Sequence, residues 1–203
     1  MIEKFKAVLA SAIWIVFVAC TAAPFKSTWR ASDDVPFPVQ GRMIAALFAS
    51  DVEATRRNAE EAMAAEITAR GGKGHTAYSL LDAESTLDRP RAFERLRQAG
   101  IEKVLVLRAV ASEPDAFRLY PWGGSRFGGW WGGHGWGWGV GYDPAYGFID
   151  TLVSIETCFY DVAADRLLWA GVSRFRNPTD VVSIVRRLAA EAFAQMAREG
   201  LIY

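Results

Sequence analysis

Cysteine and histidine are scarce in this chain of 203 residues, which contains two of each. Zinc sites need three or four such ligands at set spacings, whereas His75 and His134 lie far apart. The sequence therefore predicts no metal site and no cofactor. An excess of positive charge is also absent, because 23 basic residues face 23 acidic ones. A chain without net charge is not drawn to phosphate backbones, so nucleic acid is not an expected partner.

The chain also lacks long hydrophobic runs and recognisable catalytic motifs. The apolar run over residues 7–18 is shorter than the roughly 20 residues that a membrane-spanning helix needs. No serine elbow or phosphate-binding loop occurs, and Gly71 to Gly74 is typical of a helix end followed by a turn. Cys158 lies in a strand pattern, where a buried and unreactive thiol is expected. We therefore do not expect an enzyme.

The first 20 residues have the order of a secretory signal. Lys4 and Lys6 precede the apolar run, which ends in small residues and Cys20, so we predict a signal peptide over residues 1–19. The stretch 17–20 resembles the lipobox of bacterial lipoproteins, although Phe17 stands where that pattern prefers Leu. The resemblance implies cleavage before Cys20 and its acylation with fatty acids such as palmitate. Because Thr21 is not Asp, it also implies the outer membrane, facing the periplasm.

Two other readings of this segment remain open. Small residues over 21–23 would also suit an ordinary signal cleavage, and the segment could stay uncleaved as an anchor.

If Cys20 is acylated, Cys158 has no partner for a disulfide within the chain. Residues 20–39 contain Pro24, Pro36 and Pro38 and predict an extended tether, followed by a single α/β domain over residues 40–203.

The first half of this domain predicts alternating strands and helices. Apolar residues over 42–49 predict a strand, and Ser50 with Glu53 forms a capping box that predicts the start of a helix. That helix is expected to end at Gly71 and Gly72. A weaker strand over 75–81, a helix from Asp88 to Gly100 and a strand over 104–107 follow. This order is typical of right-handed crossovers in a parallel sheet.

The second half predicts an antiparallel hairpin and a final helix. Residues 151–160 and 166–176 alternate in hydrophobicity on either side of a turn at 161–165. Asn177 and Pro178 then suit the start of a helix that ends at Gly200. The expected fold class is α/β, with a mixed sheet of about five strands in the order β-α-β-α-β, the hairpin and the C-terminal helix.

A glycine- and tryptophan-rich insertion over residues 121–147 separates the two halves, and we expect it to be flexible. Its aromatic residues form a candidate binding loop: Trp122, Trp130, Trp131, Trp136, Trp138 and Tyr142. Such side chains stack on sugars or lie at lipid interfaces. A tolerated low-complexity loop is the alternative, and we favour it or a weakly adhesive loop, because compositional bias places no donors or acceptors.

Several motifs together resemble a family of small bacterial lipoproteins with an uncharacterised periplasmic domain. They are Cys20, the pair Thr28-Trp29, the pair Tyr160-Asp161 and the stretch from Asp165 to Trp169. The order of strands and helices also looks like the amino-terminal domain of TolB and the activator lipoproteins of cell-wall synthases. That second likeness is one of fold, which does not transfer function.

These observations predict a lipid-anchored protein of the cell envelope. We expect the membrane to be a partner through Cys20, and the domain to be a non-catalytic structural, accessory or interaction domain that binds another envelope protein. The alternative is a module that binds a glycan or a lipid-like ligand through the aromatic loop. The sequence predicts neither the identity of the partner nor the oligomeric state.

Overall fold

The computed structural model describes residues 25–32, 34–50, 52–82, 88–110, 152–176 and 178–203. The insertion at 121–147 and residues 1–24 lie outside these ranges. In chain order the elements are β1 (Phe25–Arg30), β2 (Met43–Ala49), α1 (Glu53–Ala69), β3 (Lys73–Thr76), the 3-10 helix η1 (Ala77–Ser79), α3 (Arg89–Gln98), β4 (Lys103–Val110), β5 (Leu152–Asp161), β6 (Arg166–Arg176) and α4 (Val181–Arg198).

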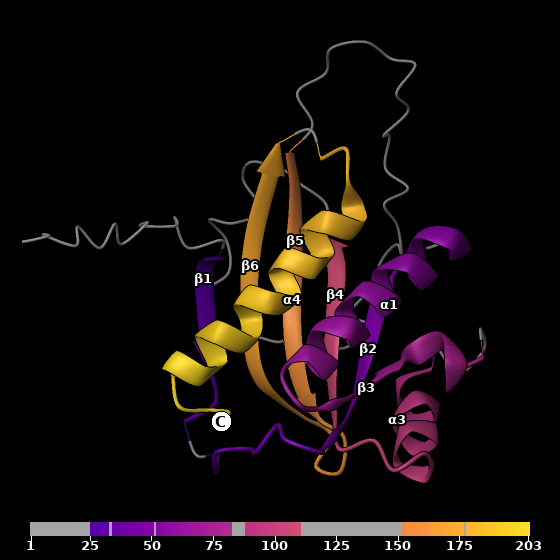
Figure 1. Ribbon diagram of the computed structural model, residues 1–203, viewed down its shortest axis with the longest axis vertical. Helices are drawn as coiled ribbons and strands as arrows, with labels where there is room; N and C mark the ends of the chain where they lie inside the picture. Colours follow the sequence, from indigo (N-terminus) through magenta and orange to yellow (C-terminus); the bar gives the residue numbers. More distant parts are fainter. Residues whose placement is uncertain (1–24, 33, 51, 83–87, 111–151, 177) are drawn as a thin grey trace, which may run out of the picture.

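The strands form one mixed sheet in the order β1-β6-β5-β4-β2-β3 (Figure 1). β2 pairs in parallel with both β3 and β4, whereas β4, β5, β6 and β1 pair antiparallel. The parallel part follows from the crossovers β2-α1-β3 and β3-α3-β4, and the antiparallel part follows from the β5-β6 hairpin. The predicted α/β class, the hairpin and the C-terminal helix are confirmed.

The sixth strand comes from the segment that was expected to be a tether. Residues 25–30 form β1, which pairs with β6 from Phe25 opposite Ser173 to Arg30 opposite Trp169. Further along, Phe37 forms a parallel bridge with Ile202. The prediction of an extended tether is therefore wrong for residues 25–39. The prolines that suggested it fall outside β1, and β1 is an edge strand, where nearby prolines are tolerated.

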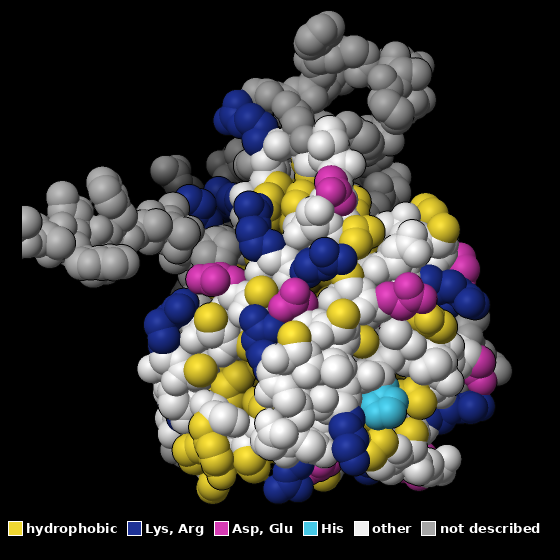
Figure 2. Space-filling model, in the orientation of Figure 1, with side chains coloured by type: hydrophobic (Ala, Val, Ile, Leu, Met, Phe, Trp, Pro, Cys, Tyr) yellow, Lys and Arg dark blue, Asp and Glu magenta, His cyan; other side chains and the backbone are white. Residues whose placement is uncertain are grey.

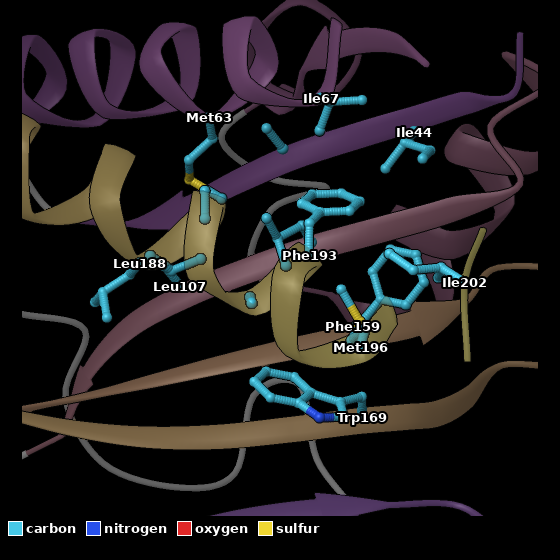
Figure 3. Packing of buried hydrophobic residues seen from close by; sticks show 14 of the residues in the cluster. Ile44, Met63, Ile67, Leu107, Phe159, Trp169, Leu188, Phe193, Met196 and Ile202 are labelled. Carbon is cyan, nitrogen blue, oxygen red and sulfur yellow. The ribbon is translucent and has the colours of Figure 1, made fainter. Parts of the chain in front are cut away.

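Side chains of the central strands alternate between two hydrophobic clusters, one on each face of the sheet. On the first face, α1 and α4 pack over Leu105, Leu107 and Phe159, as Figure 3 shows for Met63, Leu188 and Phe193. On the second face, α3 and η1 pack over a cluster that includes Val104, Val106, Cys158 and Tyr160. Because the side-chain period of a strand is two, a strand that is apolar at consecutive positions must be covered on both faces.

Three local predictions need correction. The capping box at Ser50 does not form, because α1 begins at Glu53 after Val52, and the Ser50 Oγ accepts a hydrogen bond from the Val52 N–H instead. The strand expected over 75–81 is β3 at 73–76 followed by η1. The final helix begins after Asp180, whose carboxylate accepts a hydrogen bond from the Ser183 N–H, rather than at Asn177.

The signals at other helix ends are confirmed. Asp88 caps α3, since its carboxylate accepts a hydrogen bond from the Arg91 N–H. Gly100 and Gly200, which follow α3 and α4, have φ of 74° and 71°. This left-handed backbone strains residues with a Cβ, which explains why glycine ends both helices.

The contact between β1 and the core gives a test of the corrected boundary. The ring of Phe25 meets that of Trp169 edge-on at a centroid distance of 5.1 Å, and Trp169 is fully buried. We expect Phe25→Ala to lower the free energy of unfolding by about 1–3 kcal/mol. This is less than the loss for a fully buried phenylalanine, because Phe25 is only half-buried. Urea denaturation followed by circular dichroism measures this change.

The neighbouring residue is the control. Lys26 is exposed on the same strand, so Lys26→Ala should change the unfolding free energy by less than about 0.5 kcal/mol. Equal, negligible effects of the two substitutions would show that β1 contributes nothing to the domain.

Candidate functional site

The predicted site residues Cys20, Trp122, Trp130, Trp131, Trp136, Trp138 and Tyr142 lie outside the described residues. The described residues that flank them nevertheless show where these segments join the domain. β1 begins at Phe25, opposite Ser173 near the end of β6. On the two sides of the insertion, β4 ends at Val110, which pairs with Ser154, and β5 begins at Leu152, which pairs with Arg176. The amino-terminal segment and the insertion therefore join the same end of the sheet.

Basic side chains gather at this end. Residues 25–27, 173–176 and 178–187 comprise the start of β1, the end of β6 and the first turns of α4, and they contain one acidic residue, Asp180. They contain five basic residues, which we call the basic end: Lys26, Arg174, Arg176, Arg186 and Arg187. All are exposed except Arg174, which is half-buried. Figure 2 shows Lys and Arg side chains near the end of β6 and the first turns of α4.

A shallow hollow of about 360 Å³ lies beside these residues, where β6 leads into α4. Phe175, Pro178 and Ile184 supply its apolar lining, and Arg176 and Arg187 are also part of it. The guanidinium of Arg187 lies 5.4 Å from the centre of the Phe175 ring, a distance typical of a cation–π contact. The hollow thus combines an apolar lining with cationic side chains.

Asp180, the acidic residue in these stretches, is held by hydrogen bonds at the start of α4. Its carboxylate accepts hydrogen bonds from the Ser183 hydroxyl and the Ser183 N–H, at 2.5 Å and 3.0 Å. The hydroxyl contact, followed by the backbone contact, holds the pKa of Asp180 below its ordinary value, with a smaller contribution from the charge of Arg186. Its main structural role is to cap α4.

The opposite end of the sheet has a different charge pattern. There Arg42 pairs with Glu102 at 3.1 Å, and Lys103 pairs with Asp161 at 2.9 Å. Arg166 also pairs with Asp34. A second hollow of about 360 Å³ lies beside the last two of these pairs, whose four charged side chains line it together with Val35, Phe37 and Leu168. Each of these three basic side chains thus forms an ion pair with a carboxylate.

Glu60 is a buried carboxylate with a raised pKa. It is fully buried on α1, where its two carboxylate oxygens accept hydrogen bonds from the Phe48 N–H at 3.3 Å and the Tyr78 N–H at 2.7 Å. Burial raises the pKa of Glu60 to about 7, although these hydrogen bonds act in the opposite direction. The carboxylate joins the end of β2 to η1. No part of it is exposed, so it is not accessible from the surface in this structure.

A second buried polar group lies on the face that α3 covers. Arg108 on β4 pairs with Glu156 on the neighbouring strand β5, and Glu156 is almost fully buried. Cys158 and Tyr160 follow on the same face of β5, and burial raises the pKa of both above their ordinary values. A thiol kept protonated in this way is a poor nucleophile. The prediction that Cys158 is buried is confirmed.

The described residues contain no group of three or more potential ligands that could hold a metal ion. Among the same residues, no helix combines the length and apolar character needed to cross a bilayer.

Sequence patterns did not predict these features. Glu60 could not be singled out from the sequence, because a buried carboxylate among other charged residues gives no periodic signal. The basic end draws residues from three elements that are distant in the chain, and only the pairing of β1 with β6 brings Lys26 close to the end of β6. The nearest available signal was the set of arginines at positions 174, 176, 186 and 187.

Comparison with known proteins gives matches in structure only. No protein-family model matches the chain, and no curated protein sequence matches it. Two solved structures of PelC from Paraburkholderia phytofirmans, described as dodecamers, are 12% and 11% identical, with TM-scores of 0.45 and 0.44. They match over 83% of this chain and over 95% and 94% of theirs. Lipoprotein GNA1162 from Neisseria meningitidis is 14% identical, with a TM-score of 0.40, over 78% of this chain and 99% of its own.

Glu60 gives a prediction about stability and pH. Its pKa is about 7 in the folded protein and near the ordinary 4.5 in the unfolded chain, so the folded state keeps this proton to higher pH. As the pH rises from 4.5 to 7, the unfolded chain loses the proton first and the folded state loses stability, on the order of 3 kcal/mol in total. In Glu60→Gln this part of the pH dependence should disappear.

Urea denaturation at several pH values between 4 and 8 measures the effect. The matched control is Glu61→Gln, because Glu61 is the exposed neighbour on the same helix and should leave the wild-type profile unchanged. If the profile of Glu60→Gln runs parallel to that of the wild type, the raised pKa of Glu60 is wrong.

Proposed function

We propose that this chain is a lipid-anchored protein of the bacterial cell envelope, in which acylated Cys20 holds the α/β domain at the outer membrane on the periplasmic side. The domain acts as a non-catalytic interaction or accessory domain for another envelope protein. The observation that carries the proposal is the placement of β1. The first strand of the sheet begins only five residues after Cys20, so an anchor on that residue is attached almost directly to the folded domain.

The short segment between Cys20 and Phe25 supports attachment of the domain close to the membrane. An extended chain spans at most 3.3–3.6 Å per residue, so the path from Cys20 to Phe25 covers no more than about 18 Å. Multiple acyl chains on one cysteine give stable membrane binding, because each buried CH₂ contributes about 0.8 kcal/mol. The domain therefore remains at the membrane surface, with the end that carries Phe25 nearest to it.

The placement of two titratable groups, Cys158 and Glu60, supports a non-catalytic role. The Cys158 thiol is buried and kept protonated, and the Glu60 carboxylate is buried and hydrogen-bonded to two backbone N–H groups. A catalytic acid, base or nucleophile must reach its substrate within hydrogen-bonding distance. Neither group is placed to do so in the described structure.

The surface far from the anchor offers a place for a protein partner. Val35 and Tyr203 are 86% and 75% exposed, which is unusual for large apolar side chains. They lie on neighbouring segments, because the Val39 N–H donates to the Tyr203 carbonyl and Phe37 bridges to Ile202. Hydrophobic side chains are visible near the C-terminus in Figure 2. Apolar residues rimmed by charged groups are typical of protein contact surfaces.

The anchor is tested by removing one cysteine at a time. In Cys20→Ala the protein should leave the membrane fraction and lose metabolic labelling with palmitate, because no acyl chain can be attached. Cys158→Ala is the matched control and should keep both properties, since Cys158 is buried in the sheet. Cell fractionation, labelling and mass spectrometry of the mature amino terminus provide the measurements. An unmodified terminus beginning at Ala22 or Pro24 would refute the anchor.

The partner is tested by crosslinking in cells. A photoreactive amino acid at Val35 or Tyr203 should give a specific adduct with one envelope protein, because these side chains are exposed at the end of the domain opposite the anchor. The same probe at Glu94, an exposed residue of α3, is the control and should give none. Absence of any specific adduct from Val35 and Tyr203 across growth conditions would count against the interaction role.

A further inference from the structure

We propose that the ionisation of Glu60 controls a local opening of the η1 segment, which we define as residues 77–81, while the rest of the domain stays folded. The segment follows β3 and contains the 3-10 helix η1. This inference does not depend on the proposed acylation of Cys20. It also goes beyond the effect of Glu60 on global stability, because it concerns one part of the domain that opens by itself.

Glu60 lies where three elements of the domain meet. It belongs to α1, and its carboxylate accepts hydrogen bonds from the Phe48 N–H at the end of β2 and from the Tyr78 N–H in η1. A helix begins with N–H groups that have no partner within the helix. Thr76, the residue before η1, supplies no side-chain cap, so the Glu60 carboxylate satisfies the start of η1 in its place.

Two buried side chains, Ala77 and Leu81, attach the η1 segment to the cluster on the second face of the sheet. Leu80 is half-buried and packs against the same cluster. The N–H groups of Leu80 and Leu81 donate to the Ala77 carbonyl, within the segment itself. Opening the segment therefore exposes these few side chains and leaves the cluster members from β4, β5 and α3 in place. Local openings of this kind need less free energy than global unfolding.

Polar contacts at the surface hold the outer side of the segment. The Tyr78 hydroxyl donates a hydrogen bond to Glu61 at 2.9 Å, and the Arg57 guanidinium lies 4.8 Å from the centre of the Tyr78 ring. The Ser79 hydroxyl donates to the Thr76 carbonyl at 2.7 Å. Interactions between groups that water can reach contribute little to stability, so the buried Glu60 carboxylate has the larger influence on opening.

The charged and titratable groups around Glu60 do not neutralise its carboxylate. Arg56, one turn earlier on α1, pairs with Glu53 at 2.5 Å, and its charge lowers the pKa of Glu60 by less than burial raises it. β2 has no titratable side chain. On β3 and η1, as far as the structure describes them, no titratable side chain forms a hydrogen bond or ion pair with the Glu60 carboxylate; these side chains are Lys73, His75 and Tyr78.

The direction of the pH effect follows from this burial. Burial raises the pKa of Glu60 to about 7, whereas an opened segment returns the carboxyl to water and to its ordinary pKa near 4.5. The closed segment therefore keeps the proton at pH values where the opened one has lost it. Between pH 4.5 and 7 the opened population should rise about tenfold per pH unit, or roughly 300-fold in all, and it should level off above pH 7.

Amide hydrogen exchange of the full chain, followed by NMR from pH 4.5 to 8 and corrected for the intrinsic rate, tests this inference. The reporters are the hydrogen-bonded N–H groups of Tyr78, Leu80 and Leu81. The reference amides are those of Leu105 and Phe159, which are fully buried in central strands and report on global unfolding. We expect the reporters to exchange on the order of tenfold faster than the reference amides, or more, at every pH.

Two variants separate Glu60 from other carboxylates. In Glu60→Gln the opening should no longer change between pH 4.5 and 7, because an amide does not titrate. Glu66→Gln removes a carboxylate that pairs with Arg70 on the same helix, so this matched control should keep the rise of the wild type. The chemical shift of the Glu60 carboxyl carbon in the wild type is a second measurement that requires no variant to fold, and it should titrate near pH 7.

The outcomes decide between local and global opening. Equal protection of the reporter and reference amides at every pH would show that the segment opens only with the whole domain, and would overturn the inference. Faster exchange of the reporters without a pH-dependent rise, or with the same rise in Glu60→Gln, would overturn control by Glu60. A carboxyl that titrates near pH 4.5 would do the same, because no buried charge would then drive the opening.

Discussion

The pairing of β1 with β6 determines how the amino-terminal segment is connected to the rest of the domain. Without it, residues 20–39 would be an extended chain and the domain could stand far from any anchor. With it, Phe25 packs on Trp169, and the strand runs on to Arg30, which donates a hydrogen bond to the Glu199 carbonyl at the end of α4. The edge strand thus couples the position of Cys20 in the chain to a defined place on the sheet.

The same pairing limits the residues around it. The Cβ of an alanine at position 171 would lie 2.5 Å from the ring of Trp169 and 2.6 Å from that of Phe25. Carbon atoms in contact normally stay about 3.5–4.0 Å apart, so the approach of the two aromatic rings requires glycine at this position. The contact between β1 and the core therefore depends on Gly171, Trp169 and Phe25 together.

Much of the fold could be predicted from sequence because strong local signals agree with the tertiary structure. The apolar run over 104–107 is buried on both faces as β4, and the alternation over 152–176 folds as the β5–β6 hairpin. β1 was missed because it is short, mostly half-buried and flanked by prolines, so its formation depends on β6 rather than on its own pattern. Ser50 was misassigned because two residues separate it from the start of α1. Tertiary context overrides weak local preference in both cases.

The groups that matter for function were harder to predict, because each depends on contacts between distant residues. The high pKa of Glu60 arises from burial beneath β2 and η1 and not from its neighbours in α1. The basic end forms because the register of β1 on β6 brings Lys26 close to the end of β6. No local pattern in either strand predicts that register, so the gathering of basic side chains becomes visible only in the folded domain.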